Sequence, residues 1–353
     1  MRVLYALYHY PQASETYIEA EIGYMRRLGV QVEVWSEAYV ATPYRSDVRV
    51  HTDTLGAAID VARPDLVHTH WLNSALSYEG VAAARGIPMT ARAHGFDTTP
   101  SVIAALLERP AIQRVFLYAH QYAALGRLDP RLTVIRNGFD TDLFAPTLNK
   151  DRRLVVRTAA ALAPKDPGFF LELAKCLPDH RFVLAVIACN HREGYVGELL
   201  EMRSRLNSPV EIKLNLPHAE AAALVARAGI YVHTVLPSGQ EGATPIGQPV
   251  SIAEAMATGA YVLVRNEPPL VDYVGDAGAS YHDLGTAARL IATTAQWDDA
   301  TWRSAACRSI DRAWSWHAGD SAFRPIYDTW TEMVRHRLLQ AEAPLSPRLV
   351  VAA

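Results

Sequence analysis

The sequence predicts an α/β protein made of two doubly wound lobes, each built on a parallel sheet, that face each other across a cleft. Short apolar segments alternate with amphipathic ones along most of the chain, which is typical of parallel strands covered by helices. A charged stretch over 146–153 interrupts this alternation, which then restarts. The length of 353 residues also exceeds the size at which a single core stops growing, so two domains are expected.

The first lobe is expected to span residues 1–147. Ser14 is the expected N-cap of its first helix, which ends at Gly29. From apolar runs and helical spacing we expect strands at 2–8, 30–36, 65–71, 87–97, 114–119 and 133–137, and helices at 14–28, 55–62 and 74–85.

The second lobe is expected to span residues 148–318. A long amphipathic helix follows over 319–340, and residues 341–353 form a tail. Within this lobe we expect strands at 154–162, 181–188, 210–216, 230–236 and 261–265, and helices at 167–177, 196–207, 218–228 and 250–259.

Composition excludes several classes of protein. The net charge of −3 disfavours a nucleic-acid partner, because such domains are usually basic. Three scattered cysteines give neither metal spacing nor a disulfide framework. With no signal-peptide pattern and no apolar run of spanning length, we expect a cytoplasmic enzyme. Peripheral membrane contact and the oligomeric state stay open.

The strongest motif is the block 237–260, PSGQEGATPIGQPVSIAEAMATGA. Ser251 followed by Glu254 forms a capping box, and the helix that starts there could hold a phosphate at its N-terminus. Gly242, Gly247 and Pro249 would let the backbone approach a ligand. The chain contains neither G-x-G-x-x-G nor a P-loop, which disfavours dehydrogenases and P-loop enzymes.

This block resembles the donor-binding signature of retaining glycosyltransferases of family 4, which have the GT-B fold of two Rossmann-like lobes. Other segments match in the same order: SETYI near the start, LVHTHW, ARAHGFD, VIRNGFDTDLF, and WSWH before the final helix. The resemblance covers nearly the whole chain. It implies a nucleoside diphosphate sugar donor, no cofactor, no bound metal, and a final helix that returns to the first lobe.

The family carries two glutamates in this block. The resemblance makes Glu254 the one that binds the nucleotide ribose. An ungapped count places Ile246 at the other, sugar-binding position, whereas an insertion over 243–247 places Glu241 there, and we favour the insertion. Donor-binding roles then extend to Gly242, Gln248, Pro249, Val250 and Ser251.

The resemblance also assigns residues outside this block. His94 would contact the donor sugar and help to position the transition state, and Lys165 would neutralise the diphosphate. The arginine that the family pairs with this lysine reads as Ala161 here, and Arg157 or Arg265 is a candidate substitute.

The remaining candidates lie in the first lobe. Asn137 would form a turn at the floor of the cleft. Glu15, Thr16 and His70 are expected on the acceptor side. Asp140 and Asp142 could be interpreted as metal ligands, but we reject this interpretation because acidic residues in this segment more readily cap a loop and a helix start.

The resulting hypothesis is a retaining glycosyltransferase that moves a sugar from a nucleoside diphosphate to an acceptor hydroxyl, with a sugar, lipid or metabolite as acceptor. It would act in polysaccharide, glycolipid or secondary-metabolite biosynthesis. Two alternatives stay open: a nucleotide-sugar 2-epimerase of the same fold, and a non-catalytic nucleotide-sugar binder.

Overall fold

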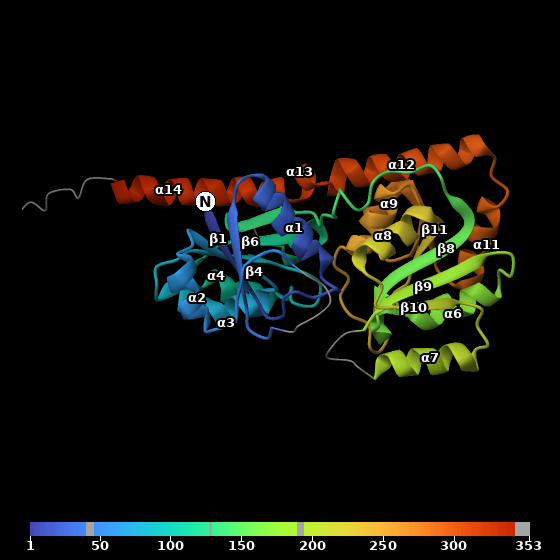
Figure 1. The fold of residues 1–353 in the computed structure, drawn as a ribbon, viewed down its shortest axis with the longest axis horizontal. Helices are drawn as coiled ribbons and strands as arrows, with labels where there is room; N and C mark the ends of the chain where they lie inside the picture. Colours follow the sequence, from blue (N-terminus) through green and yellow to red (C-terminus); the bar gives the residue numbers. More distant parts are fainter. Residues whose placement is uncertain (40–45, 127–128, 189–193, 343–353) are drawn as a thin grey trace, which may run out of the picture.

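The structure is a computed structural model that describes residues 1–39, 46–126, 129–188 and 194–342. Figure 1 shows two α/β lobes side by side, with the first in blue and cyan and the second in green to orange. Each lobe holds one sheet between helices, so the predicted fold class is confirmed.

The sheet of the first lobe has the order β3-β2-β1-β4-β5-β6-β7, and all of its pairings are parallel. Its central strands are buried on both faces, which explains their continuous apolar runs. The strands are β1 (Arg2–Leu7), β2 (Gln31–Ser36), β3 (Val50–His51), β4 (Leu66–His70), β5 (Met89–Arg92), β6 (Ile112–Tyr118) and β7 (Leu132–Ile135).

The sheet of the second lobe repeats this plan with the order β10-β9-β8-β11-β12-β13, again entirely parallel. Its strands are β8 (Asp151–Ala160), β9 (Arg181–Ile187), β10 (Glu211–Leu214), β11 (Ala228–His233), β12 (Tyr261–Arg265) and β13 (Gly278–Tyr281). The strand order reverses between β1 and β4 in one lobe and between β8 and β11 in the other. Ligands of open parallel sheets bind beyond the carboxyl ends of the strands at such a point.

Helices cover both sheets. In the first lobe they are α1 (Thr16–Arg27), α2 (Leu55–Ala62), α3 (Leu72–Ala83), α4 (Pro100–Leu107) and α5 (Ala119–Leu125). In the second lobe they are α6 (Pro167–Lys175), α7 (Tyr195–Arg205), α8 (His218–Arg227), α9 (Val250–Ala257), α10 (Pro268–Val274), α11 (Leu284–Thr294) and α12 (Asp299–His317), with short 3₁₀ turns at Ala163–Lys165 and Gly275–Ala277.

The C-terminal helices return to the first lobe, as expected (Figure 1). The single helix expected over 319–340 is instead two, α13 (Gly319–Ala322) and α14 (Arg324–Glu342), separated at Phe323. Ile326 and Trp330 of α14 are fully buried in the first lobe's core, and the Trp330 indole donates to Thr90 Oγ1 at 3.1 Å. The apolar face of the helix therefore packs against a lobe that is remote in sequence.

Two expected helix caps are wrong. Helix α1 begins at Thr16 after Glu15, so Ser14 lies outside it. Helix α9 begins at Val250 after Pro249, so Ser251 is already helical and forms no capping box with Glu254. A proline before the first helical residue fixes the entry of the chain without a side-chain cap. The short edge strands β3 and β13 were absent from the sequence-based expectation.

Candidate active site

A cavity of about 320 Å³ lies between the lobes, at the carboxyl ends of the central strands. Residues far apart in the sequence form its wall, and several predicted site residues are among them. The lining includes Ser14, Thr16, Tyr17, His94, Gly95, Tyr118, Asn137, Arg157, Thr158, Lys165, His218, His233, Thr244, Pro245, Gly247, Gln248, Pro249, Val250, Ser251 and Glu254.

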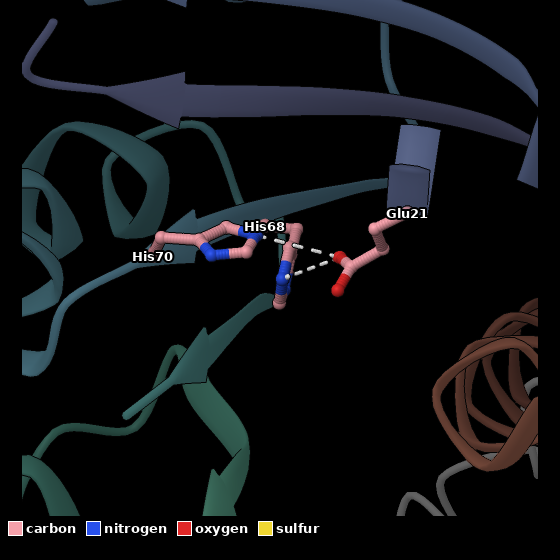
Figure 2. A group of neighbouring side chains, drawn as sticks. All are labelled: Glu21, His68 and His70. Carbon is pink, nitrogen blue, oxygen red and sulfur yellow. Dashed lines mark ion pairs between the residues drawn. The ribbon is translucent and has the colours of Figure 1, made fainter. Parts of the chain in front are cut away.

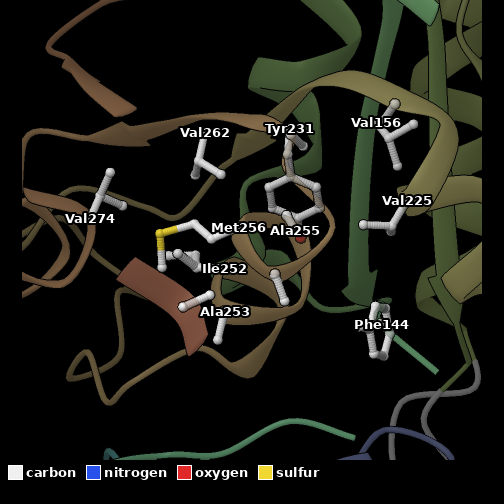
Figure 3. Packing of buried hydrophobic residues seen from close by; sticks show 14 of the residues in the cluster. Phe144, Val156, Val225, Tyr231, Ile252, Ala253, Ala255, Met256, Val262 and Val274 are labelled. Carbon is white, nitrogen blue, oxygen red and sulfur yellow. The ribbon is translucent and has the colours of Figure 1, made fainter. Parts of the chain in front are cut away.

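Helix α9 presents its N-terminus to this cavity. Its Ile252, Ala253, Ala255 and Met256 are fully buried in the second lobe's core, and Figure 3 shows them packed beside Tyr231. This apolar packing fixes the helix in place, while its first-turn N–H groups and the positive end of its dipole lie at the cavity, where they can receive an anion.

Glu254 lies on the side of α9 that faces the first lobe. The residue is 7% exposed. Thr16 Oγ1 donates to Glu254 Oε1 at 3.5 Å across the gap between the lobes, and His218 Nε2 lies 3.9 Å from the same oxygen. Because Glu254 does not cap its own helix, its carboxylate is available to accept hydrogen bonds from a ligand.

Arg157 places a buried positive charge beneath the α9 N-terminus. Its guanidinium donates to Thr234 O at 3.0 Å, to the Tyr231 hydroxyl at 2.9 Å and to Ser251 Oγ at 3.5 Å. These contacts hold it against the cavity wall at 2% exposure. The sequence could name Arg157 as a candidate substitute but could not show that strand β8 carries it to the helix terminus.

Two other predicted cationic residues have different surroundings. Lys165 ends the 3₁₀ turn after β8 and lines the cavity, whereas Ala161, directly after β8, is buried and is not among the lining residues. Arg265 is not among the lining residues of the cavity. Its guanidinium pairs with Asp166 at 2.9 Å and donates to Val235 O at 2.7 Å, which binds the end of β12 to the start of α6.

In the block 237–260, the structure departs from the sequence-based expectation at the segment 243–247. Glu241 and Gly242 are exposed and lie outside the cavity lining, whereas Thr244, Pro245 and Gly247 line it. The predicted sugar-binding glutamate is therefore not at the cavity in this structure. Sequence spacing could not locate it, because the path of a loop rich in glycine and proline depends on its contacts.

The same segment touches the first lobe. His120 Nε2 lies 2.9 Å from Ile246 O, and a Cβ added at Gly95 would lie 2.7 Å from Pro245 O. Asn137 N and Nδ2 donate to Gln248 Oε1 and O, each at 2.8 Å. Glycine at position 95 thus allows two backbones from different lobes to meet at the cavity.

His94 reaches the cavity from the loop after β5. Its Nε2 lies 3.0 Å from His70 Nδ1, and its ring packs on Trp71 and Tyr17 with centroid distances of 4.6 and 5.0 Å. Burial, with added repulsion from His70 and Arg92, holds the pKa of His94 well below its usual range, so the ring is neutral near pH 7.

Behind His94 lies a fully buried polar cluster. Figure 2 shows Glu21 of α1 facing His68 and His70 of β4, with Glu21 Oε1 3.3 and 3.4 Å from their Nε2 atoms. His70, predicted on the acceptor side, lies in this cluster and does not line the cavity. Among the described residues, these three alone are spaced as metal ligands. Arg92 already pairs with the other oxygen of Glu21, which disfavours a second cation there.

Of the other site residues predicted in the first lobe, some line the cavity and others do not. Thr16 and Asn137 line the cavity, whereas Glu15 does not. Burial raises the pKa of Glu15 to about 8, which keeps its carboxyl protonated at neutral pH. Asp140 Oδ1 accepts from the backbone N–H groups of Asp142 and Leu143 at 2.9 and 3.3 Å, so it caps a turn as expected.

Comparison with solved structures identifies the fold as GT-B. HepE from Anabaena, solved with UDP and glucose, is 18% identical, with a TM-score of 0.72 over 94% of this chain and 100% of that one. Sucrose-phosphate synthase from Thermosynechococcus elongatus is 14% identical, with a TM-score of 0.70 over 95% and 100%. The catalytic domain of Starch Synthase IV from Arabidopsis thaliana, bound to ADP and acarbose, is 15% identical, with a TM-score of 0.64 over 95% and 99%.

These identities establish a shared fold and nothing finer. No model of a known protein family matches the chain, and no curated protein matches it. Within the described part of the chain, no helix has both the length and the apolar character needed to cross a membrane.

Proposed function

We propose that this protein is a glycosyltransferase that uses a nucleoside diphosphate sugar as donor and retains the anomeric configuration. The observation that carries the proposal is the set of groups that the second lobe contributes to the cavity: the α9 N-terminus, Glu254, Lys165 and the buried Arg157. They supply the positive potential and the hydrogen-bond acceptor that a ribose and a diphosphate require.

Each part of the donor has a matching group in the cavity. The N–H groups of Val250 and Ser251 and the ammonium of Lys165 would receive the diphosphate, with Arg157 adding charge from below. Glu254 would accept from the two ribose hydroxyls. As the bond to the sugar breaks, negative charge grows on the diphosphate, and these fixed charges stabilise it most at that stage.

The sugar would then lie between Thr244 and His94, at the boundary of the lobes. Thr244 offers a hydroxyl near the place where the resemblance expects an acid, which supports a donor site that differs from the family pattern. The acceptor would approach from the first lobe, on the side of Thr16 and Tyr17. Two neighbours in the comparison, HepE and Starch Synthase IV, were solved with UDP and ADP respectively, which supports a nucleotide donor.

The deciding experiment starts from nucleotide binding. A panel of nucleoside diphosphates and their sugars is added to the full chain, and thermal unfolding is followed. A ligand at 100 times its dissociation constant should stabilise the fold by about 2.7 kcal/mol. No response to any nucleotide would refute the proposal.

The best donor is then incubated with sugar, lipid and metabolite acceptors, and the product's anomeric configuration is read by NMR. Transfer with retention supports the proposal. A sugar isomerised at C2 without acceptor would instead identify an epimerase. Binding without turnover, with Glu254→Ala abolishing it, would identify a nucleotide-sugar binder. Buffer without added metal and the same buffer with a chelator test metal independence.

A further inference from the structure

Three side chains form a continuous line from the core of the first lobe to the cavity. Glu21 lies on α1, His70 at the end of β4, and His94 in the loop after β5. Glu21 Oε1 is 3.4 Å from His70 Nε2, and His70 Nδ1 is 3.0 Å from His94 Nε2. Glu21 and His70 are 0% exposed, whereas His94 lines the cavity.

Glu21 carries a negative charge in this setting. Burial alone would favour its neutral form, but the ion pair with Arg92 and the contacts with His70 and His68 outweigh burial and hold the pKa of Glu21 well below its usual range. Tyr5 also donates its hydroxyl to Glu21 Oε1 at 3.0 Å. An ionised carboxylate only accepts hydrogen bonds, so each group that faces it presents a proton.

The charge of Glu21 determines which ring nitrogens of His70 and His94 carry a proton. His70 is neutral near pH 7, because burial lowers the pKa of His70 to about 4. Its Nε2 lies 3.4 Å from Glu21 Oε1 without an aligned hydrogen bond, and the charge of the carboxylate favours the ring proton on this nitrogen, which leaves a lone pair on Nδ1. His94 Nε2, at 3.0 Å from that lone pair, must donate. His94 is neutral as well, so its remaining nitrogen, Nδ1, has no proton.

The backbone around His94 is held just as firmly. Asp97 Oδ1 accepts from His94 N at 2.9 Å, and Gln121 Nε2 donates to His94 O. The rings of His70 and His94 are 25° from parallel with centroids 5.1 Å apart, and this contact holds the ring of His94 as well. Ring position and tautomer are thus both set before any ligand binds, which is the usual requirement for a preorganised site.

We propose that Glu21 is a positioning residue that acts through His70 to hold His94 as the Nε2–H tautomer, so that His94 meets its ligand as a hydrogen-bond acceptor at Nδ1. This inference deepens the proposed function, on which it rests. An acceptor nitrogen binds a hydroxyl and repels a phosphate oxygen. His94 would therefore bind a hydroxyl of the donor sugar, and the diphosphate would belong to the opposite end of the cavity.

The tautomer of His94 can be measured without any assay of activity. The full chain is labelled with ¹⁵N-histidine, and ring nitrogens are observed near pH 7 through two-bond ¹H–¹⁵N correlations. The His94 signals are assigned by their loss in His94→Asn. We expect a protonated Nε2 and a bare Nδ1. A protonated Nδ1, or an imidazolium, would overturn the proposal whatever the variants show.

A pair of variants at position 70 tests the relay itself. His70→Leu removes the acceptor, so we expect mixed tautomers of His94 and a kcat/KM for the donor sugar lowered by about tenfold, the effect of one hydrogen bond. His70→Asn keeps an acceptor oxygen near the former Nδ1 but presents no N–H to Glu21, so it should restore both only in part. Wild-type tautomer and kcat/KM in His70→Leu would overturn the relay.

His51→Leu is the matched control, because His51 also pairs with a glutamate of the first lobe, Glu33, away from the cavity. It should change neither readout. Thermal unfolding of each variant reports on the fold. The expected tautomer in a protein that transfers no sugar would support the relay and refute glycosyl transfer. The opposite tautomer in an active enzyme would refute the relay and leave the proposed function standing.

Discussion

Replacing Gly95 by alanine tests whether the contact between the lobes builds the donor site. The added Cβ would lie 2.7 Å from Pro245 O, whereas ordinary contact begins near 3.4 Å, so the two backbones must separate by about 0.7 Å. Pro245 lies in the segment 243–247 that lines the cavity. Because the clash lies between the lobes, opening them relieves it without disrupting either core.

The magnitude follows from the size of this clash. Overpacking typically costs 1–3 kcal/mol, and here that energy acts against the closed arrangement. A shift of 1–3 kcal/mol between two conformations changes the affinity of a ligand that needs the closed one by roughly 5- to 150-fold. We therefore expect Gly95→Ala to bind the preferred nucleotide sugar more weakly by that factor.

Titration calorimetry with the nucleotide sugar measures this change, and thermal unfolding without ligand measures the fold. Gly80→Ala is the control, since Gly80 lies in α3 and, apart from its chain neighbours and the backbone of its own helix, no heavy atom of the described residues comes within 4 Å of its added Cβ. It should bind normally and stabilise the protein by about 0.5–1 kcal/mol through helix propensity. Wild-type affinity in Gly95→Ala would refute the reasoning.

Three further changes test the site. Glu254→Gln should weaken nucleoside diphosphate binding by about 10- to 150-fold, because a charged acceptor of ribose hydroxyls is lost; calorimetry giving equal affinities would contradict that role. Lys165→Met should weaken binding of the diphosphate while leaving the nucleoside unaffected, which parallel titrations can show. Glu15→Gln tests a pH effect. The pKa of Glu15 is raised from 4.5 to about 8 in the fold, so the unfolded carboxyl ionises first and the wild type loses stability from about pH 4.5 to 8. The gain in thermal stability of Glu15→Gln should therefore grow from pH 5 to pH 8, and a constant difference would contradict the shift.

The sequence correctly predicted a helix within the block 237–260 but misplaced the first residue of that helix. Helix α9 is recognisable because its buried face repeats at helical spacing, as Ile252, Ala255 and Met256 show. Its start was misplaced because Ser251 and Glu254 fit a capping box equally well on paper. In the fold, the helix begins at Val250, directly after Pro249, and Glu254 faces Thr16 of the other lobe. The side chain of Glu254 therefore contacts the other lobe and does not cap its own helix.

The buried cluster of Glu21, His68 and His70 behind His94 could be predicted from the sequence only in part. His70 ends β4 and His94 follows the end of β5, so their closeness follows from the neighbouring positions of these two strands. Glu21 gave no signal, because a glutamate in an amphipathic helix is usually solvated. Only the packing of α1 against the sheet shows that its carboxylate is buried against Arg92.

The sequence by itself determined the two lobes, their parallel sheets, the helix within the block 237–260 and the positions of His94 and Lys165 after strand ends. These features depend on local periodicity and on residues near strand ends, which neighbouring residues largely control. Only the tertiary structure showed that Arg157 lies at the N-terminus of helix α9, that Glu241 lies outside the cavity and that Glu21 is buried beside His70. These features depend on contacts between segments distant in the chain, where burial and charge, rather than local pattern, fix each side chain's environment.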